Sequence, residues 1–241
     1  MRNCSAAMTS PRPILISVHL PKTAGTSFQD SLRAAYGARL QLRYKERPLH
    51  RSPGERQRRV IRGALQHALF GLRDDSVDCI HGHFLPASYA RIRGRSPVRY
   101  VTWFRDPVER LVSHYHYWLR SYNGAQAGAL HRQVVEENWS LEAFVFAPAL
   151  RDLYSAFLWR FPLERFDFIG ITEHYSDDLA YFSEHFLEQT VPEVRHNASP
   201  QGDENSTAID GELRRRIERF HSKDMSLYHR ALELRAARSG A

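Results

Sequence analysis

Residues 14–27 read ILISVHLPKTAGTS, an apolar run followed by a short polar loop. The apolar run is rich in β-branched residues and stops at Pro21, as is typical of a buried parallel strand. Beyond the loop, apolar residues recur at the spacing of one helix face: Phe28, Leu32 and Ala35. This stretch therefore predicts a strand, a tight loop and a helix in direct succession.

The loop has the composition of an anion-binding site. The first N–H groups of a helix lack partners within it and lie at the positive end of its dipole, which favours a bound phosphate. Lys22 adds a positive charge, Gly25 allows close approach to the backbone, and hydroxyl donors come from Thr23, Thr26 and Ser27. The loop is not a Walker A sequence, which places its lysine after the second glycine. By itself it is equally explained as an ordinary polar turn before a helix.

Further apolar segments alternate with helical patterns along the chain. We predict four more strands, at residues 39–45, 77–80, 98–104 and 166–171. A helix is predicted from Ser52 to Gly71, with a serine cap and one apolar stripe, and another after Asp106, where Glu109 completes a capping box. This order predicts a single α/β domain with a central parallel sheet flanked by helices. We expect that domain to span residues 13–235, between a loosely held N-terminus (1–12) and a C-terminal tail (236–241).

Composition narrows the class of protein. A length of 241 residues suits one domain, and the formal net charge of +7 favours anionic partners. The two cysteines, Cys4 and Cys79, form no disulfide framework and no metal cluster. No apolar stretch has the roughly 18 residues needed to span a bilayer, and no signal peptide is recognisable. We expect a cytoplasmic protein with no integral membrane segment, either free or peripheral to a membrane, unless an anchor has been removed.

The segment from Arg43 to Arg73 holds nine arginines or lysines against two glutamates. Such a run is either a solvated helix face or a docking strip for an acidic acceptor. Both interpretations stay open.

Two motifs resemble those of one enzyme family. The sequence HLPKTAGTS at residues 19–27 resembles the 5'-phosphosulfate loop of sulfotransferases that use 3'-phosphoadenosine-5'-phosphosulfate (PAPS), and FRDPVERLVSHY at 104–115 is similar to their 3'-phosphate motif. The resemblance covers residues 14–182 and looks closest to the heparan sulfate 2-O-sulfotransferases and their bacterial relatives. It implies that Arg105 and Ser113 bind the 3'-phosphate. It also implies a P-loop-like site for the phosphosulfate group at Lys22, Thr23, Ala24, Gly25, Thr26 and Ser27.

Two histidines follow the strand predicted at residues 77–80. In extended backbone, residues two apart point to the same side, so His81 and His83 are expected to face one cleft. Histidine suits a general base because its ordinary pKa lies near neutrality. The resemblance implies that His83 is the base, that His81 supports or orients the acceptor, and that Lys22 neutralises charge on the departing phosphate. The alternatives are a structural pair that caps a loop, or a metal site, for which no third ligand is apparent.

These observations predict a sulfotransferase that moves a sulfuryl group from PAPS to an acceptor hydroxyl, without a metal. The expected acceptor is an oligosaccharide or polysaccharide, acidic or neutral, and no nucleic-acid partner is expected. One alternative is a small-molecule kinase, which would need a magnesium-binding acid beside the loop. Another is a non-catalytic module that binds polyanions through the arginine-rich segment. A lipid or small-metabolite acceptor and the oligomeric state stay open.

Overall fold

The computed structural model describes residues 12–44, 46, 52–187 and 209–239. Its centre is a five-stranded sheet with the order β2-β3-β1-β4-β5, in which every neighbouring pair is parallel. The strands are β1 (Arg12–Val18), β2 (Leu40–Arg43), β3 (Cys79–Gly82), β4 (Arg95–Phe104) and β5 (Phe168–Ile171). The α/β class and the parallel sheet flanked by helices are confirmed.

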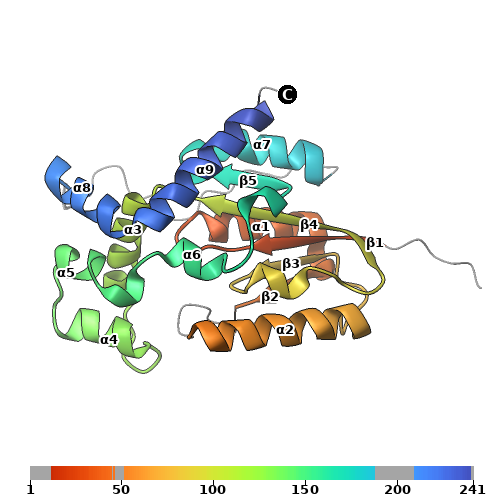
Figure 1. The fold of residues 1–241 in the computed structure, drawn as a ribbon, viewed down its shortest axis with the longest axis horizontal. Helices are drawn as coiled ribbons and strands as arrows, with labels where there is room; N and C mark the ends of the chain where they lie inside the picture. Colours follow the sequence, from red (N-terminus) through yellow and green to blue (C-terminus); the bar gives the residue numbers. More distant parts are fainter. Residues whose placement is uncertain (1–11, 45, 47–51, 188–208, 240–241) are drawn as a thin grey trace, which may run out of the picture.

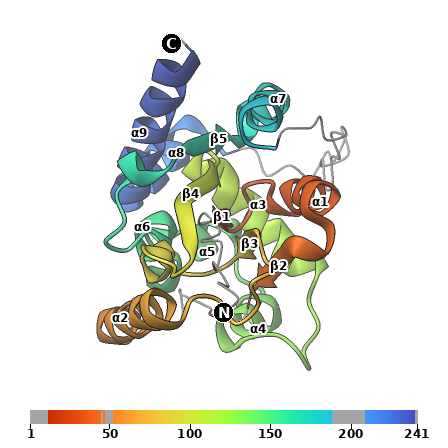
Figure 2. The ribbon, with the colours of Figure 1, turned by 90° about the vertical axis from the view of Figure 1, so that its right-hand side faces the viewer.

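Alternation along β1 sends side chains to both faces of the sheet. Ile14, Ile16 and Val18 pack into one buried cluster, while Leu15 packs into another with Phe28. Helices α1 (Gly25–Tyr36) and α7 (Tyr175–Phe186) cover the Leu15 face (Figure 2). The opposite face is covered by α6 (Leu153–Phe157) and α9 (Ser222–Ser239). Helix α2 (Pro53–Phe70) lies on the same side as α6, further from the sheet. The strands are therefore buried on both faces, as expected for a parallel sheet.

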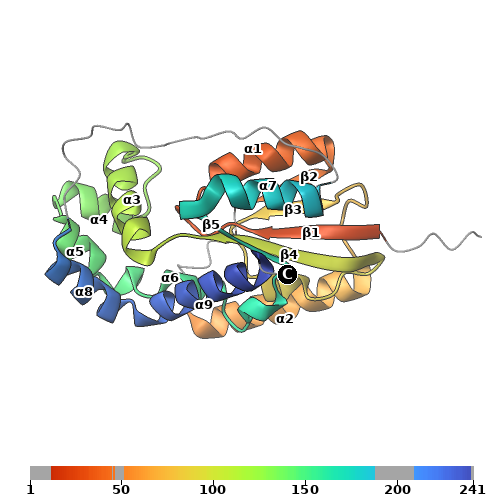
Figure 3. The ribbon, with the colours of Figure 1, turned by 90° about the horizontal axis from the view of Figure 1, so that it is seen from above.

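A third cluster of helices lies at the carboxyl ends of the strands, as Figures 1 and 3 show. These helices are α3 (Pro107–Arg120), α4 (Ala129–Glu136), α5 (Leu141–Val145) and α8 (Gly211–Phe220), and they share an apolar core of their own. None of the helices among the described residues is both long enough and apolar enough to cross a bilayer.

The strand order creates a switch point beside β1. The chain leaves β1 toward β2, whereas the connection from β3 crosses over β1 to reach β4. In parallel sheets of this kind, ligands bind outside the carboxyl ends of the strands at such a switch point. The loop at residues 19–24 and the segment beginning at Arg105 follow the paired strands β1 and β4, so both start at this point.

Several local predictions need correction. The chain from 236 to 239, expected as a tail, continues helix α9, and residues 240–241 lie outside the described part. The capping box expected before α3 does not form. Asp106 caps the helix by accepting from the N–H groups of Val108 and Glu109, but its own N–H donates to Glu173 rather than to Glu109.

Candidate anion-binding and acceptor site

The loop after β1 is shaped by two residues with left-handed backbone. Lys22 has φ 67° and Ala24 has φ 59°, values that residues with a side chain rarely adopt. Ala24 is the N-cap of α1 and supplies no side-chain cap, and no acidic residue lies in the first turn. Backbone strain of this kind concentrates at functional sites. The positive end of α1 is thus presented uncapped at the switch point.

Some of the remaining loop side chains stabilise the loop itself, and others are exposed to solvent. Thr23 is fully buried and its hydroxyl donates to the carbonyl of Leu20 at 2.8 Å, so this side chain closes the loop rather than reaching a ligand. Ser27 is also buried, whereas Thr26 is exposed in the first turn of α1. Gly25 packs against the His19 imidazole. Thr26 is therefore the loop hydroxyl best placed for an external ligand.

Three cations converge on the loop. Burial, followed by the nearby charges of Arg120 and Arg105, lowers the pKa of Lys22 to about 8. The Lys22 ammonium lies 4.0 Å from the centroid of the Tyr117 ring, a cation–π contact that holds it at the helix α3 surface. Mutual repulsion among three cations is relieved by an anion, so the electrostatics of the loop favour a multiply charged one.

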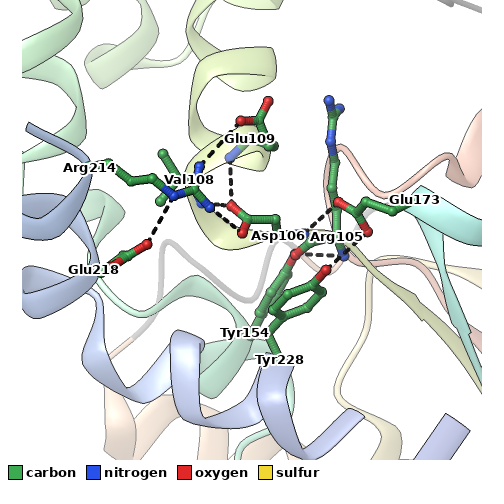
Figure 4. A network of polar contacts seen from close by, with 9 residues as sticks. All are labelled: Arg105, Asp106, Val108, Glu109, Tyr154, Glu173, Arg214, Glu218 and Tyr228. Carbon is green, nitrogen blue, oxygen red and sulfur yellow. Dashed lines mark hydrogen bonds and ion pairs between the residues drawn. The ribbon is translucent and has the colours of Figure 1, made fainter. Parts of the chain in front are cut away.

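Residues of the second motif lie where β4 passes into α3. The hydroxyl of Tyr154 donates to the Arg105 carbonyl at 2.7 Å and accepts from the Arg105 N–H at 3.2 Å. These contacts fix the backbone, and the Arg105 side chain extends away from the network drawn in Figure 4. Within the described chain, no hydrogen bond or ion pair occupies its guanidinium. Arg105 is therefore available to a ligand.

Ser113 is half-buried on α3, two turns after Arg105. At 3.6 residues per turn, Ser113, Tyr117 and Arg120 share one face of this helix. Because Tyr117 contacts Lys22 and Arg120 perturbs its pKa, this is the face turned toward the loop. Ser113 and the loop therefore border the same space.

The two predicted histidines gather around a third. The ring centroid of His19 lies 5.2 Å from that of His81 and 4.6 Å from that of His83. His81 is buried and its Nδ1 lies 2.8 Å from the hydroxyl of Ser17. His83 is only half-buried, and its Nε2 has no hydrogen-bond partner within the described residues. The Nε2 of His81 likewise has no partner among these residues, so what distinguishes the two histidines is that His83 is the more exposed.

Tyr44 lies next to these rings and joins them to helix α1. Its hydroxyl lies 3.0 Å from Nδ1 of His19 and donates to Oε1 of Gln29 at 2.9 Å. Its ring lies 4.9 Å from that of His83, centroid to centroid. Tyr44 therefore helps to orient His19 beside His83.

All three histidines are held in the neutral form. Burial lowers the pKa of His81 to about 3, with a further contribution from His83, and lowers that of His83 to about 4. Burial, followed by His81, His83 and Lys22, brings the pKa of His19 well below its ordinary value. A neutral imidazole can accept a proton. Because Gly25 of the loop packs against the His19 ring, the loop and the histidines lie next to each other.

Sequence reasoning missed five residues of this region. His19 and Tyr44 stand at the ends of β1 and β2, so adjacent parallel strands could have suggested them. Arg120 lies on the Ser113 face of α3 and was readable from helical periodicity. His114, whose pKa is lowered by burial and then by Arg110, Lys22, His131 and His83, gave no such signal. Arg110 also gave no signal in the sequence. It is fully buried, and its guanidinium has no hydrogen-bond partner among the described residues.

A cluster of histidines can also bind a metal ion. Across the described residues, no group of three or more histidine, cysteine, aspartate or glutamate side chains is arranged to hold an ion. The geometry instead places three neutral imidazoles beside three cations. That combination can bind an anion and deprotonate a neighbouring hydroxyl.

Comparison with known proteins finds solved structures of related shape. The chain is similar in fold to a bacterial sulfotransferase. The crystal structure of the sulfotransferase from Alicyclobacillus acidocaldarius aligns with a TM-score of 0.44 and 16% identity, over 89% of this chain and 93% of that one. No family model matches the sequence, and neither does any curated protein. A likeness at this level carries no argument about activity, and closeness to the heparan sulfate 2-O-sulfotransferases stays a prediction.

Proposed function

We propose that this protein is a sulfotransferase that moves a sulfuryl group from PAPS to a hydroxyl of a carbohydrate acceptor. The observation that carries the proposal is the placement of Lys22. Its ammonium contacts the Tyr117 ring on α3, lies near Arg105 and Arg120, and is close enough to His19 to lower that histidine's pKa. Phosphate-binding charge thus lies beside His19, whose ring contacts that of the proposed base His83.

The donor's two phosphate groups fit two separate parts of the site. The loop from Lys22 to Ser27 would hold the 5'-phosphosulfate through the helix start and the ammonium. Arg105 and Ser113 would hold the 3'-phosphate, since Arg105 follows β4 near Lys22 and Ser113 lies on the face of α3 that contacts Lys22. When bound, PAPS supplies a sulfuryl group activated by its anhydride bond to phosphate.

We assign proton transfer to His83 because it is more exposed than His81 and because its pKa, about 4, keeps it neutral. As the acceptor oxygen bonds to sulfur, His83 takes the hydroxyl proton. The electron pair of the broken S–O bond stays on the phosphate oxygen, where Lys22 stabilises the added charge. His81, buried against Ser17, positions the neighbouring rings rather than touching the acceptor.

The kinase alternative is disfavoured by what surrounds Asp106. This acid follows β4, where a magnesium-binding carboxylate would be needed, yet both of its oxygens are engaged. Oδ1 caps α3 and Oδ2 pairs with Arg214 at 2.6 Å, as Figure 4 shows. Its carboxylate therefore serves to dock α8 on α3.

Titration calorimetry with 3'-phosphoadenosine-5'-phosphate (PAP), the desulfated product, tests the proposal. PAP should bind equally well in EDTA and in magnesium, and more tightly than ATP with magnesium. A strict requirement for magnesium, or a preference for ATP, would transfer the assignment to the kinase. Binding of neither nucleotide would leave the polyanion-binding module as the better interpretation.

A further inference from the structure

Helix α2 carries its large apolar side chains on its outer face. Ile61, Leu65, Leu69 and Phe70 are 51%, 56%, 56% and 77% exposed, and no residue of this helix is fully buried. With Gln66, Arg58 and Arg62 they line one surface groove. A helix at the surface of a globular protein normally turns such a stripe toward the core.

The inner face of α2 is occupied by small and polar residues. A Cβ on Gly63 would lie 3.0 Å from that of Ser88, in the short helix Pro86–Tyr89. Nδ1 of His67 lies 2.8 Å from the carbonyl of Ser88, and its ring stacks on that of Tyr89. These contacts fix the rotation of α2, so the outward apolar stripe is the orientation that its packing selects.

Arginines accompany the apolar stripe. Arg58 and Arg62 line the groove itself, and Arg59 is exposed beside them. No ion pair to any of the three is found within the described ranges, and Glu55 is the one acidic residue in the sequence of α2. The face therefore combines exposed aliphatic surface with uncompensated positive charge.

This combination distinguishes between possible occupants. A second copy of the chain would bring the arginines of two α2 helices together, and like charges oppose that pairing. A sugar chain would leave the branched side chains of Ile61, Leu65 and Leu69 without an apolar partner, since these offer neither hydrogen bonds nor aromatic stacking. An anionic bilayer satisfies both features, because the aliphatic residues enter the acyl boundary while arginines contact the headgroups.

We propose that α2 is a membrane-docking helix that binds the surface of an anionic lipid bilayer through Ile61, Leu65, Leu69, Phe70 and the flanking arginines. Figures 1 and 3 show this helix at the periphery of the molecule, away from α8. Its docking does not depend on the function proposed above. It gives the basic segment at residues 43–73 a role other than holding an acidic acceptor.

Vesicle co-sedimentation of the full chain tests this inference. Vesicles of phosphatidylcholine with phosphatidylglycerol should bind the protein at low salt, and vesicles of phosphatidylcholine alone should bind it much less. Arg58→Gln/Arg62→Gln should weaken binding about tenfold or more, since each basic residue near an anionic surface contributes substantially. Leu65→Ser/Leu69→Ser should weaken it as well, because the buried apolar area is lost.

The control is a charge change of equal size on another exposed helix. Among the described residues, Arg215 and Arg219 form ion pairs with Glu212 alone, so Arg215→Gln/Arg219→Gln on α8 should leave vesicle binding unchanged. Unchanged melting temperatures of all variants would show that the fold is intact. Equal binding by every variant, or no binding of the wild type at low salt, would overturn the proposal. A wild-type dimer in sedimentation equilibrium that Leu65→Ser/Leu69→Ser dissociates would instead identify α2 as a self-interface.

Discussion

The His19 imidazole packs directly against Gly25: a Cβ at position 25 would lie 1.8 Å from Nε2 of His19. This contact joins the anion-binding loop to the histidine cluster, since His19 also stacks on His81. No side chain larger than hydrogen fits at position 25 without moving the imidazole or the loop.

Gly25→Ala should therefore impair both parts of the site. We expect a loss of about 1–3 kcal/mol of stability from overpacking and a large loss of PAP affinity, measured by denaturant unfolding and calorimetry. Gly128→Ala is the matched control, because nothing lies within 4 Å of a Cβ there. Adding His19→Ala to Gly25→Ala should restore part of the affinity. An affinity of Gly25→Ala equal to that of the wild type would show that the loop does not bind the nucleotide.

The affinity for PAP should fall as the pH rises above about 8. Free Lys22 loses its proton near that pH because burial and the nearby Arg120 and Arg105 lower its pKa to about 8. Bound phosphate stabilises the charged form of Lys22 and so raises its pKa. Above the pKa of free Lys22, PAP binding therefore takes up a proton, and the affinity for PAP falls as the pH rises. We expect a drop of more than about tenfold between pH 7 and 9.5. Lys22→Arg, which stays charged, should show little of this decline, and an identical decline in both proteins would exclude Lys22 as the cause.

Arg105→Ala should lower PAP affinity about tenfold or more, because a charge-assisted contact to phosphate is removed. Stability should change little, since the contacts of Arg105 with Tyr154 are made by the backbone. Ser113→Ala should have a smaller effect because only one hydroxyl donor is lost. Arg219→Ala, an exposed charge on α8, controls for net charge. Wild-type affinity in Arg105→Ala would remove this residue from the 3'-phosphate site.

Part of the candidate site could be predicted from the sequence because neighbouring residues in the chain determine the local backbone conformation. The strand, loop and helix at residues 14–36, and the extended spacing of His81 and His83, depend on neighbours in the chain. The place of His19 depends on the register of β1 against β3, in which Ser17 lies beside His81 and Val18 beside Gly82. No spacing along the chain encodes that register.

Helix α2 shows a second feature that the sequence does not predict, namely which way an apolar stripe faces. Its apolar periodicity was correctly interpreted as a helical stripe, but the same pattern serves a buried face and an exposed one. What turns the stripe outward is the close packing of Gly63 and His67 on Ser88. That contact brings together segments more than twenty residues apart, and their sequences give no sign of it.

A buried carboxylate should make stability depend on pH. Asp224 accepts hydrogen bonds from the N–H groups of Tyr154 and Ser155, yet burial, opposed by the charge of Arg110, raises its pKa to about 6. Between pH 4 and 6 the Asp224 carboxyl keeps its proton in the folded protein, whereas in the unfolded chain it releases that proton. Its contribution to the free energy of unfolding is therefore full below pH 4 and is lost as the pH rises through 6. The expected loss is about 3 kcal/mol.

Other groups titrate in the same range, so the test is a comparison with Asp224→Asn, which has no such proton. Urea unfolding of both proteins from pH 4 to 7 should show the wild type losing about 3 kcal/mol relative to the variant. A difference that stays constant with pH would show that Asp224 is ionised throughout.

The most direct test of the proposed chemistry is a paired measurement on His83→Ala. PAP affinity is measured by calorimetry, and sulfuryl transfer from labelled PAPS is measured with a panel of polysaccharides. The wild type should transfer label, and its rate should hold well below pH 6.5 because the pKa of His83 is about 4. His83→Ala should bind PAP normally and transfer about a hundredfold to ten-thousandfold more slowly, the usual cost of losing a general base. Near-normal transfer by His83→Ala would contradict the assignment of this histidine as the base. If the wild type neither binds PAP nor transfers label to any acceptor, the proposed sulfotransferase function is contradicted.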